Sequence, residues 1–270
     1  MERNIDKLAR ELANGLSLDE LRRKQGANPY EKKIDIAPAP KSDAELRYWQ
    51  SVFSAEPRAP MFHARKIVQE MSYDDARKKT WAILMERADE ISALKNIDFA
   101  FVFTDKQAAV VAAIIRYFIN DPTCPLNLAK GLFVCGLPGA GKTEVMMAMH
   151  RLCKENGLSK YFEITDMSTV HICAKGNKDF DPVTPLKQFA RCLDEFGRHI
   201  GPTVRFGDAL DINEAVIEER YKGFSRHGKL THIVTNMTPN EAAASFSPMI
   251  TDRIKEMCQS VEYPGTSNRK

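Results

Sequence analysis

The sequence predicts an α/β protein with a central parallel sheet and helices on both faces. Two observations support this prediction. Residues 136–143 match the phosphate-binding loop pattern G-x-x-x-x-G-K-[ST] and lie between an apolar run and a helix-like run. After this loop, short apolar runs alternate with helix-like stretches, which is typical of parallel strands joined by helices.

Each expected element has local support. Residues 131–135, Gly-Leu-Phe-Val-Cys, are a short apolar run typical of a buried strand, and residues 144–154 contain no Gly or Pro and suit a helix. Thr238 begins the run Thr-Pro-Asn-Glu, which combines an N-cap, a first-turn proline and a glutamate at the third position. We expect further strands over 161–165 and 230–235, and helices over 74–94, after Thr104 and over 211–224.

The composition is that of an ordinary globular protein. The 270 residues are 43% hydrophobic and 28% charged, with a formal net charge of +3, so bound nucleic acid would need a local basic strip. No apolar run reaches the roughly 20 residues of a membrane helix and the first residues are charged, which predicts a cytoplasmic protein without membrane contact. The six cysteines contain no C-x-x-C pair, which favours reduced, buried thiols over disulfides or zinc.

The chain is expected to divide near residue 95. Residues 1–95 read as a helical N-terminal module with proline-containing linkers, because apolar residues recur at helical spacing near the start and prolines interrupt residues 26–60. This module is expected to bind a partner. Residues 96–270 form the second domain, which contains the phosphate loop.

The phosphate loop predicts a nucleotide site. Its glycines let backbone N–H groups turn toward a polyphosphate, Lys142 can reach the outer phosphates, and the Thr143 hydroxyl can bind Mg²⁺. The alternative is a glycine-rich turn before an ordinary helix. The expected nucleotide-binding residues are Gly136, Leu137, Pro138, Gly139, Ala140, Gly141, Lys142, Thr143 and Glu144.

An acidic pair is expected to complete this site. In the run Leu-Asp-Glu-Phe-Gly, Asp194 would hold Mg²⁺ and Glu195 would polarise the attacking water. Arg191 interrupts the apolar strand expected before the pair, and the apolar residues over 186–193 also fit one face of a surface helix. Asp166 and Asp208 are competing acids, although neither precedes a second carboxylate.

A polar residue follows the expected strand over 230–235. Asn236 lies at the carboxyl end of that strand, where ligands of open parallel sheets collect, so it can hold the nucleophilic water or a phosphate oxygen. An asparagine that forms a turn is the alternative. His232, within the strand, is expected to be a structural histidine with a satisfied, partly buried side chain.

The order of these motifs also resembles a known family. The runs GLPGAGKT, LDEFG, IVTNMTPNE, ITDRIKEM (250–257) and GTSNR (265–269) are similar to those of the AAA+ ATPases of the DnaC-like helicase-loader and IstB-like group. The resemblance covers about Asp98 to the C-terminus. It implies a three-layer P-loop AAA+ fold without a C-terminal lid domain, and a Mg²⁺-dependent ATPase.

The resemblance also implies roles for single residues. Asn236 matches the first sensor, Arg253 the arginine finger offered to a neighbouring subunit, and Arg269 the second sensor, which touches the nucleotide in its own subunit. A guanidinium across a subunit boundary would couple hydrolysis to assembly. From the residues alone, without the resemblance, the favoured interpretation of Arg253 and Arg269 is that they are surface salt-bridge residues.

The expected function is ATP-dependent loading of a hexameric, DnaB-type replicative helicase onto single-stranded DNA. The N-terminal module would bind the helicase, and the ATPase domain would self-associate, bind ATP and Mg²⁺ and touch the DNA. One alternative is an IstB-like transposition helper that binds duplex DNA. Another is a nucleotide-gated adaptor that hardly hydrolyses, which the position of Arg191 beside the acidic pair suggests.

Overall fold

The computed structural model describes residues 68–176, 180–201, 203–205 and 208–265. The chain divides between His63 and Ala64 into two compact units, and every described residue belongs to the second. The helices expected near the start of the chain therefore lie outside the described residues, as does Arg269. The N-terminal module remains a prediction.

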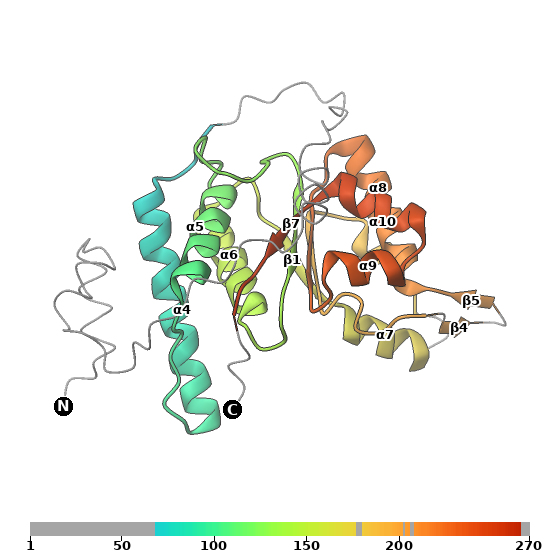
Figure 1. Ribbon diagram of the computed structural model, residues 1–270, viewed down its shortest axis with the longest axis horizontal. Helices are drawn as coiled ribbons and strands as arrows, with labels where there is room; N and C mark the ends of the chain where they lie inside the picture. Colours follow the sequence, from blue (N-terminus) through green and yellow to red (C-terminus); the bar gives the residue numbers. More distant parts are fainter. Residues whose placement is uncertain (1–67, 177–179, 202, 206–207, 266–270) are drawn as a thin grey trace, which may run out of the picture. The chain divides into compact units, whose positions relative to one another are not determined.

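A five-stranded parallel sheet forms the centre of the described unit (Figure 1). Its strands, in order across the sheet, are β2 (Glu163–Asp166), β3 (Arg191–Asp194), β6 (Thr231–Thr235), β1 (Gly131–Cys135) and β7 (Cys258–Glu262). Both β1 and β6 are buried along their whole length, which explains the continuous apolar run of β1, whereas β6 also buries the polar residues Thr231, His232 and Thr235. The α/β fold with a central parallel sheet is confirmed.

Helices follow most strands, as expected for parallel connections. They are α4 (Tyr73–Lys95), α5 (Asp105–Phe118), α6 (Lys142–Asn156), α7 (Met167–Gly176), α8 (Ile212–His227), α9 (Pro239–Ser245) and α10 (Pro248–Met257). A 3₁₀ turn, η1 (Thr184–Leu186), precedes β3, and a separate hairpin of β4 (Thr203–Arg205) and β5 (Asp208–Leu210) precedes α8. None of the described helices is long and apolar enough to cross a membrane.

Sequence-predicted helix starts are confirmed at two capping boxes. The Thr104 side chain accepts a hydrogen bond from the Gln107 N–H at the start of α5, and Thr238 accepts one from Glu241 N–H at the start of α9. In both cases the third residue's side chain accepts from the cap backbone in return, which satisfies two N–H groups that the helix leaves free.

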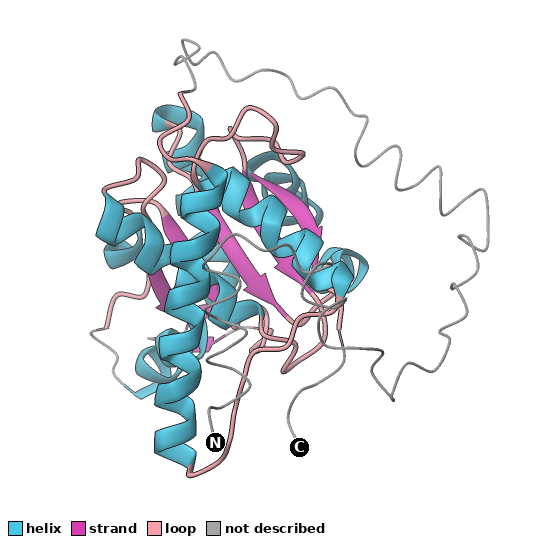
Figure 2. Cartoon of the chain, turned by 90° about the vertical axis from the view of Figure 1, so that its left-hand side faces the viewer, coloured by secondary structure: helices cyan, strands magenta, loops and turns pink. Residues whose placement is uncertain are grey.

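Alternating residues of β1 separate the core into two layers. Leu132 and Val134 belong to a cluster with α4, α5 and α6, whereas Phe133 and Cys135 belong to a cluster with α7, α8, α9 and α10. Figure 1 shows these two groups of helices on opposite sides of the sheet, and Figure 2 shows the first group in front of the strands. The result is a three-layer α/β arrangement.

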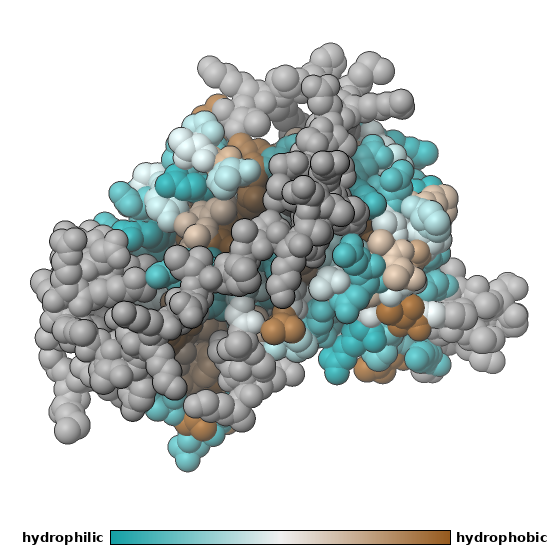
Figure 3. Space-filling view, in the orientation of Figure 1, coloured by the Kyte–Doolittle hydropathy of each residue, from teal (hydrophilic) through white to brown (hydrophobic). Residues whose placement is uncertain are grey.

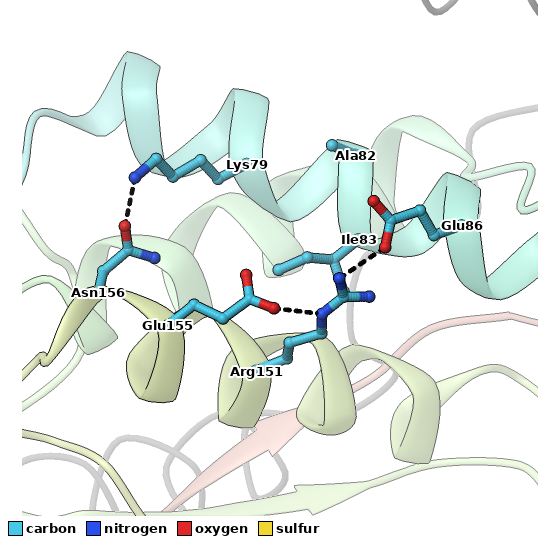
Figure 4. A pocket seen from close by; sticks show the side chains of 7 residues that line it. All are labelled: Lys79, Ala82, Ile83, Glu86, Arg151, Glu155 and Asn156. Carbon is cyan, nitrogen blue, oxygen red and sulfur yellow. Dashed lines mark hydrogen bonds and ion pairs between the residues drawn. The ribbon is translucent and has the colours of Figure 1, made fainter.

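The long helix α4 packs with this unit. Ala76, Ile83 and Leu84 are buried in the cluster that contains α5 and α6. The Arg151 guanidinium of α6 lies 2.6 Å from the Glu86 carboxylate of α4, and Lys79 also donates to Asn156 (Figure 4). Although the expected N-terminal module extended to residue 95, α4 lies in the same compact unit as the phosphate loop.

A buried arginine holds the connection that leads into β3. Arg220 of α8 is 1% exposed and donates to the Thr231 hydroxyl and to the carbonyl oxygens of Leu186, Phe189 and Leu230, at 2.7–2.9 Å. Burial lowers the pKa of Arg220 to about 10, so the side chain remains charged at neutral pH. The Arg220 side chain therefore joins α8 to the residues that immediately precede β3 and β6.

Candidate nucleotide site

The phosphate loop joins the end of β1 to the start of α6. Three of its glycines have positive φ, 152° at Gly136, 78° at Gly139 and 102° at Gly141, and Gly141 is the N-cap of α6. A Cβ at Gly136 would lie 2.4 Å from the carbonyl oxygen of Tyr263, so space as well as φ excludes a side chain there. The loop thus leads directly into the start of α6, and the first turn of a helix is where an anion commonly binds.

Lys142, the first residue of α6, connects this loop to the next strand. Its side chain is almost buried, and Nζ donates to the carbonyl oxygens of Gly136 and Leu137 at 2.8 and 2.9 Å. Nζ also donates to Oδ1 of Asn236 at 2.9 Å. The predicted phosphate lysine and the polar residue after β6 are thus in direct contact.

The acidic pair lies where the β3 strand ends. Asp194 is the last residue of β3, and its Oδ1 accepts hydrogen bonds from the Thr143 hydroxyl at 3.1 Å and from the Glu195 N–H at 3.0 Å. Burial raises the pKa of the Asp194 carboxyl, and these two hydrogen bonds offset only part of that effect. The alternative of a surface helix over 186–193 is wrong, because β2 and β6 pair with β3 on both sides.

Glu195 begins a sharp turn after the strand. Its φ is +53°, an uncommon value for a residue other than glycine, and its side chain is 28% exposed. The Arg198 guanidinium lies 3.5 Å from the Glu195 carboxylate. Glu195 thus lies in the turn that follows the strand, while its neighbour Asp194 remains hydrogen-bonded to Thr143 of α6.

Arg191 does not disturb the acidic pair. It is the first residue of β3, three residues before Asp194, which corresponds to about 10 Å along an extended strand. Its guanidinium donates to the Pro185 carbonyl at 2.8 Å and to the Thr165 hydroxyl at 3.3 Å. The arginine therefore belongs to the amino end of the strand, and the acids to its carboxyl end.

Glu144 has a partner outside the loop. Its carboxylate lies 3.0 Å from Nε of Arg87 in α4, and Nη2 of the same arginine donates to the second oxygen at 3.5 Å. Arg87 also pairs with Glu90. The Glu144 side chain thus connects the first turn of α6 to α4.

Arg253 lies on α10 and is held by α8. Its Nη1 is 3.0 Å from the Glu218 carboxylate, and the guanidinium lies 5.2 Å from the centre of the Tyr221 ring. The Tyr221 hydroxyl donates to Glu256 at 2.8 Å. The side chain is 25% exposed, so part of it remains accessible beside this ion pair.

The competing acids have other structural roles. Asp166 ends β2 beside Asp194, but its oxygens accept from the Ser168 N–H and the Thr169 hydroxyl and so cap α7. Asp208 lies in β5, outside the main sheet. His232 is fully buried instead of partly buried; its Nδ1 accepts from the Leu132 N–H at 3.2 Å, whereas its Nε2 has no hydrogen-bond partner within the described residues.

Two residues beside the loop were not expected. The Gln107 side chain, through Nε2, donates to the carbonyl of Ala140 at 3.5 Å, and the ring of Tyr263 packs in the same buried cluster as Ala140. The capping box at Thr104 is the signal that could have drawn attention to Gln107. No sequence pattern marks Tyr263, because β7 has the mostly polar sequence Cys-Gln-Ser-Val-Glu.

Other features of the described surface do not add to this site. The hollow between α4 and α6 in Figure 4 is lined by ion-paired and polar side chains and lies along the outer face of these helices. The surface in Figure 3 is mostly hydrophilic, with small separate hydrophobic patches. All six cysteines are free, and four of them are buried.

Solved structures provide a comparison for this arrangement. Several solved structures are similar to this chain. A primosome component from Streptococcus pyogenes serotype M3 matches with 16% identity and a TM-score of 0.47, over 63% of this chain and 85% of that one. DnaI matches with 18% identity and a TM-score of 0.46, over 63% and 88% of the two chains.

The DnaC helicase loader matches with 17% identity and a TM-score of 0.42, over 60% of this chain and 92% of that one. No protein-family profile and no curated protein matches the chain.

Proposed function

We propose that this chain is a Mg²⁺-dependent AAA+ ATPase that loads a replicative helicase onto single-stranded DNA. The observation that carries the ATPase is the pair of contacts that join the phosphate loop helix to two neighbouring strands. Lys142 contacts Asn236 after β6, and Thr143 contacts Asp194 at the end of β3. These four side chains come from three separate segments and meet at the carboxyl edge of one sheet, where a nucleotide would bind.

The residues fit a nucleotide with a divalent cation. Thr143 and Asp194 offer two oxygen ligands, and a cation would stabilise the charged form of the Asp194 carboxyl, which burial disfavours. The described residues contain no cluster of three His, Cys, Asp or Glu side chains that could hold a metal alone. This suits Mg²⁺, which commonly takes one or two protein oxygens together with substrate phosphates and water. When bound, Mg²⁺ would neutralise charge on the phosphates.

Each side chain then has a distinct task. Lys142 and the N–H groups at the start of α6 bind the outer phosphates. Glu195 accepts a proton from the attacking water, while Asn236 holds that water or a phosphate oxygen. Arg269 would contact the nucleotide in the same subunit. Because Arg191 lies at the far end of β3, the observation that favoured a non-hydrolysing adaptor no longer applies.

Arg253 would complete the site of a neighbouring copy. A mixture of the Arg253→Ala and Glu195→Gln proteins is expected to hydrolyse ATP faster than either variant alone, in a steady-state phosphate-release assay. In the mixture, an intact Glu195 in one subunit can face an intact Arg253 from the other. A mixture no faster than its separate components would contradict action across a subunit boundary.

Glu218→Gln provides the matched control for this test. It breaks the same ion pair but leaves the Arg253 guanidinium in place. If Arg253 only stabilised α8 against α10, both variants would behave alike, because a partly exposed ion pair contributes about 0–1 kcal/mol. As a finger residue, Arg253 is required for turnover and Glu218 is not.

The loading role rests on the N-terminal unit. The full chain is expected to retain a hexameric replicative helicase in a pull-down, whereas a chain without residues 1–63 is expected to lose the helicase and keep ATP binding. Deletion of residues 1–63 leaves α4 with its packing partners. Helicase capture by the shortened chain would refute this division of roles. Preferential stimulation of turnover by duplex DNA would favour the transposition helper.

A further inference from the structure

The C-terminal end of β7 lies against the phosphate loop. The N–H of Tyr263, the residue after β7, donates to the carbonyl of Cys135 at 2.7 Å, which continues the β1–β7 pairing up to the first loop glycine. The Tyr263 carbonyl occupies the space beside Gly136. Tyr263 is therefore fixed by its backbone directly next to the loop.

The side chain of Tyr263 lies close to the other end of the loop, at Gly141. The residue is 1% exposed, and its ring belongs to the core cluster that includes Ala140. A Cβ built at Gly141 would have the Tyr263 hydroxyl as its nearest neighbour, at 3.9 Å. The phenol thus spans from the first loop glycine to the glycine that caps α6.

The hydroxyl has no hydrogen-bond partner within the described residues. A buried polar group without a partner destabilises a fold, whereas phenylalanine would fill the same volume without that cost. Burial also raises the pKa of Tyr263 above its usual value, so the group remains a neutral donor. Packing explains the ring but does not explain the hydroxyl.

Gly265 and Gln107 provide a second contact on the same loop. A Cβ at Gly265 would lie 2.7 Å from Nε2 of Gln107 and 3.6 Å from Cβ of Ala140. Gln107 accepts from the Thr104 N–H through Oε1 at 2.9 Å, so its position is set by the cap of α5. The segment 263–265 and the start of α5 therefore enclose the loop around Ala140.

We infer that Tyr263 is a positioning residue of the nucleotide site, whose hydroxyl bonds the loop backbone near Gly141 when the loop holds a polyphosphate. This inference rests on the proposed function. When nucleotide is bound, the hydrogen bond from the Tyr263 hydroxyl to the loop adds to the affinity for ATP. The ring alone supports the loop in the absence of nucleotide.

Tyr263→Phe tests the inference in the full-length protein. Calorimetric titration with ATP and Mg²⁺ is expected to show about two- to tenfold weaker binding, the range of one neutral hydrogen bond. The melting temperature without nucleotide is expected to be unchanged or higher, and its rise on adding ATP smaller than in the wild type. In steady-state hydrolysis, KM is expected to rise with little change in kcat.

Tyr117→Phe is the matched control, because its hydroxyl already donates to the Lys130 carbonyl at 2.6 Å. Loss of that bond is expected to lower the melting temperature and leave ATP affinity unchanged. Wild-type ATP affinity in Tyr263→Phe, or destabilisation without nucleotide similar to that of Tyr117→Phe, would overturn the inference. Absence of ATP binding by the wild-type protein would overturn the proposed function and this inference with it.

Discussion

The Lys142→Ala protein is expected to bind ATP at least about 100-fold more weakly than the wild type in calorimetric titration. The side chain provides a buried cation beside the phosphate loop, and each hydrogen bond to a charged group contributes about 1.5–3 kcal/mol, where 1.4 kcal/mol is tenfold in affinity. Alanine also removes the contact between α6 and Asn236. ATP binding and the side-chain contact between the loop after β1 and Asn236 after β6 are therefore lost together.

Lys154→Ala is the control for this substitution. Lys154 lies in the last turn of the same helix and is exposed, so its removal tests the loss of one positive charge from α6 without changing the loop. This variant is expected to bind ATP like the wild type. Tight binding by Lys142→Ala would contradict the site as a whole.

The second large effect is expected from Glu195→Gln. This protein should bind ATP with wild-type affinity, while kcat falls about 10²–10⁴-fold, the usual contribution of a general base. Glutamine preserves the size of the side chain and cannot accept the proton of the attacking water. Steady-state phosphate release and calorimetry on the same preparation separate the two effects.

Asp166→Asn distinguishes the two acidic strand ends. Asp166 is paired in register with Asp194 but caps α7, and the single side-chain oxygen of asparagine can still accept the cap hydrogen bond from the Ser168 N–H. Turnover is therefore expected to survive this substitution. If Asp166→Asn stopped hydrolysis and Glu195→Gln did not, the catalytic acid would lie on β2 instead of after β3.

The sequence predicts helices and strands correctly where several short local patterns indicate the same element. The phosphate loop, its flanking strand and helix, and the caps at Thr104 and Thr238 follow from short patterns. The strand β3 was ambiguous, because only Cys192 and Leu193 are buried between two charged residues. Its conformation is decided by pairing with β2 and β6, which no local pattern records.

The candidate site shows the same limit. Its residue types were predictable, since a phosphate loop requires a nearby acid and strand ends collect polar groups. The contacts between Thr143 and Asp194 and between Arg87 and Glu144 join residues more than fifty positions apart, and only the folded sheet brings them together. The in-chain partner of Arg253 was unpredictable for the same reason.

The pairing of β1 has a consequence for biosynthesis. Both neighbours of this central strand come from late in the chain, since Phe133 pairs with Ile233 on one side and with Ser260 on the other. Such non-local pairing slows folding, because the intervening chain must be ordered before the contacts form. A nascent chain that has emerged only as far as α8 carries the complete phosphate motif but neither β6 nor β7, so the sheet around the phosphate loop can form only after both strands have been synthesised.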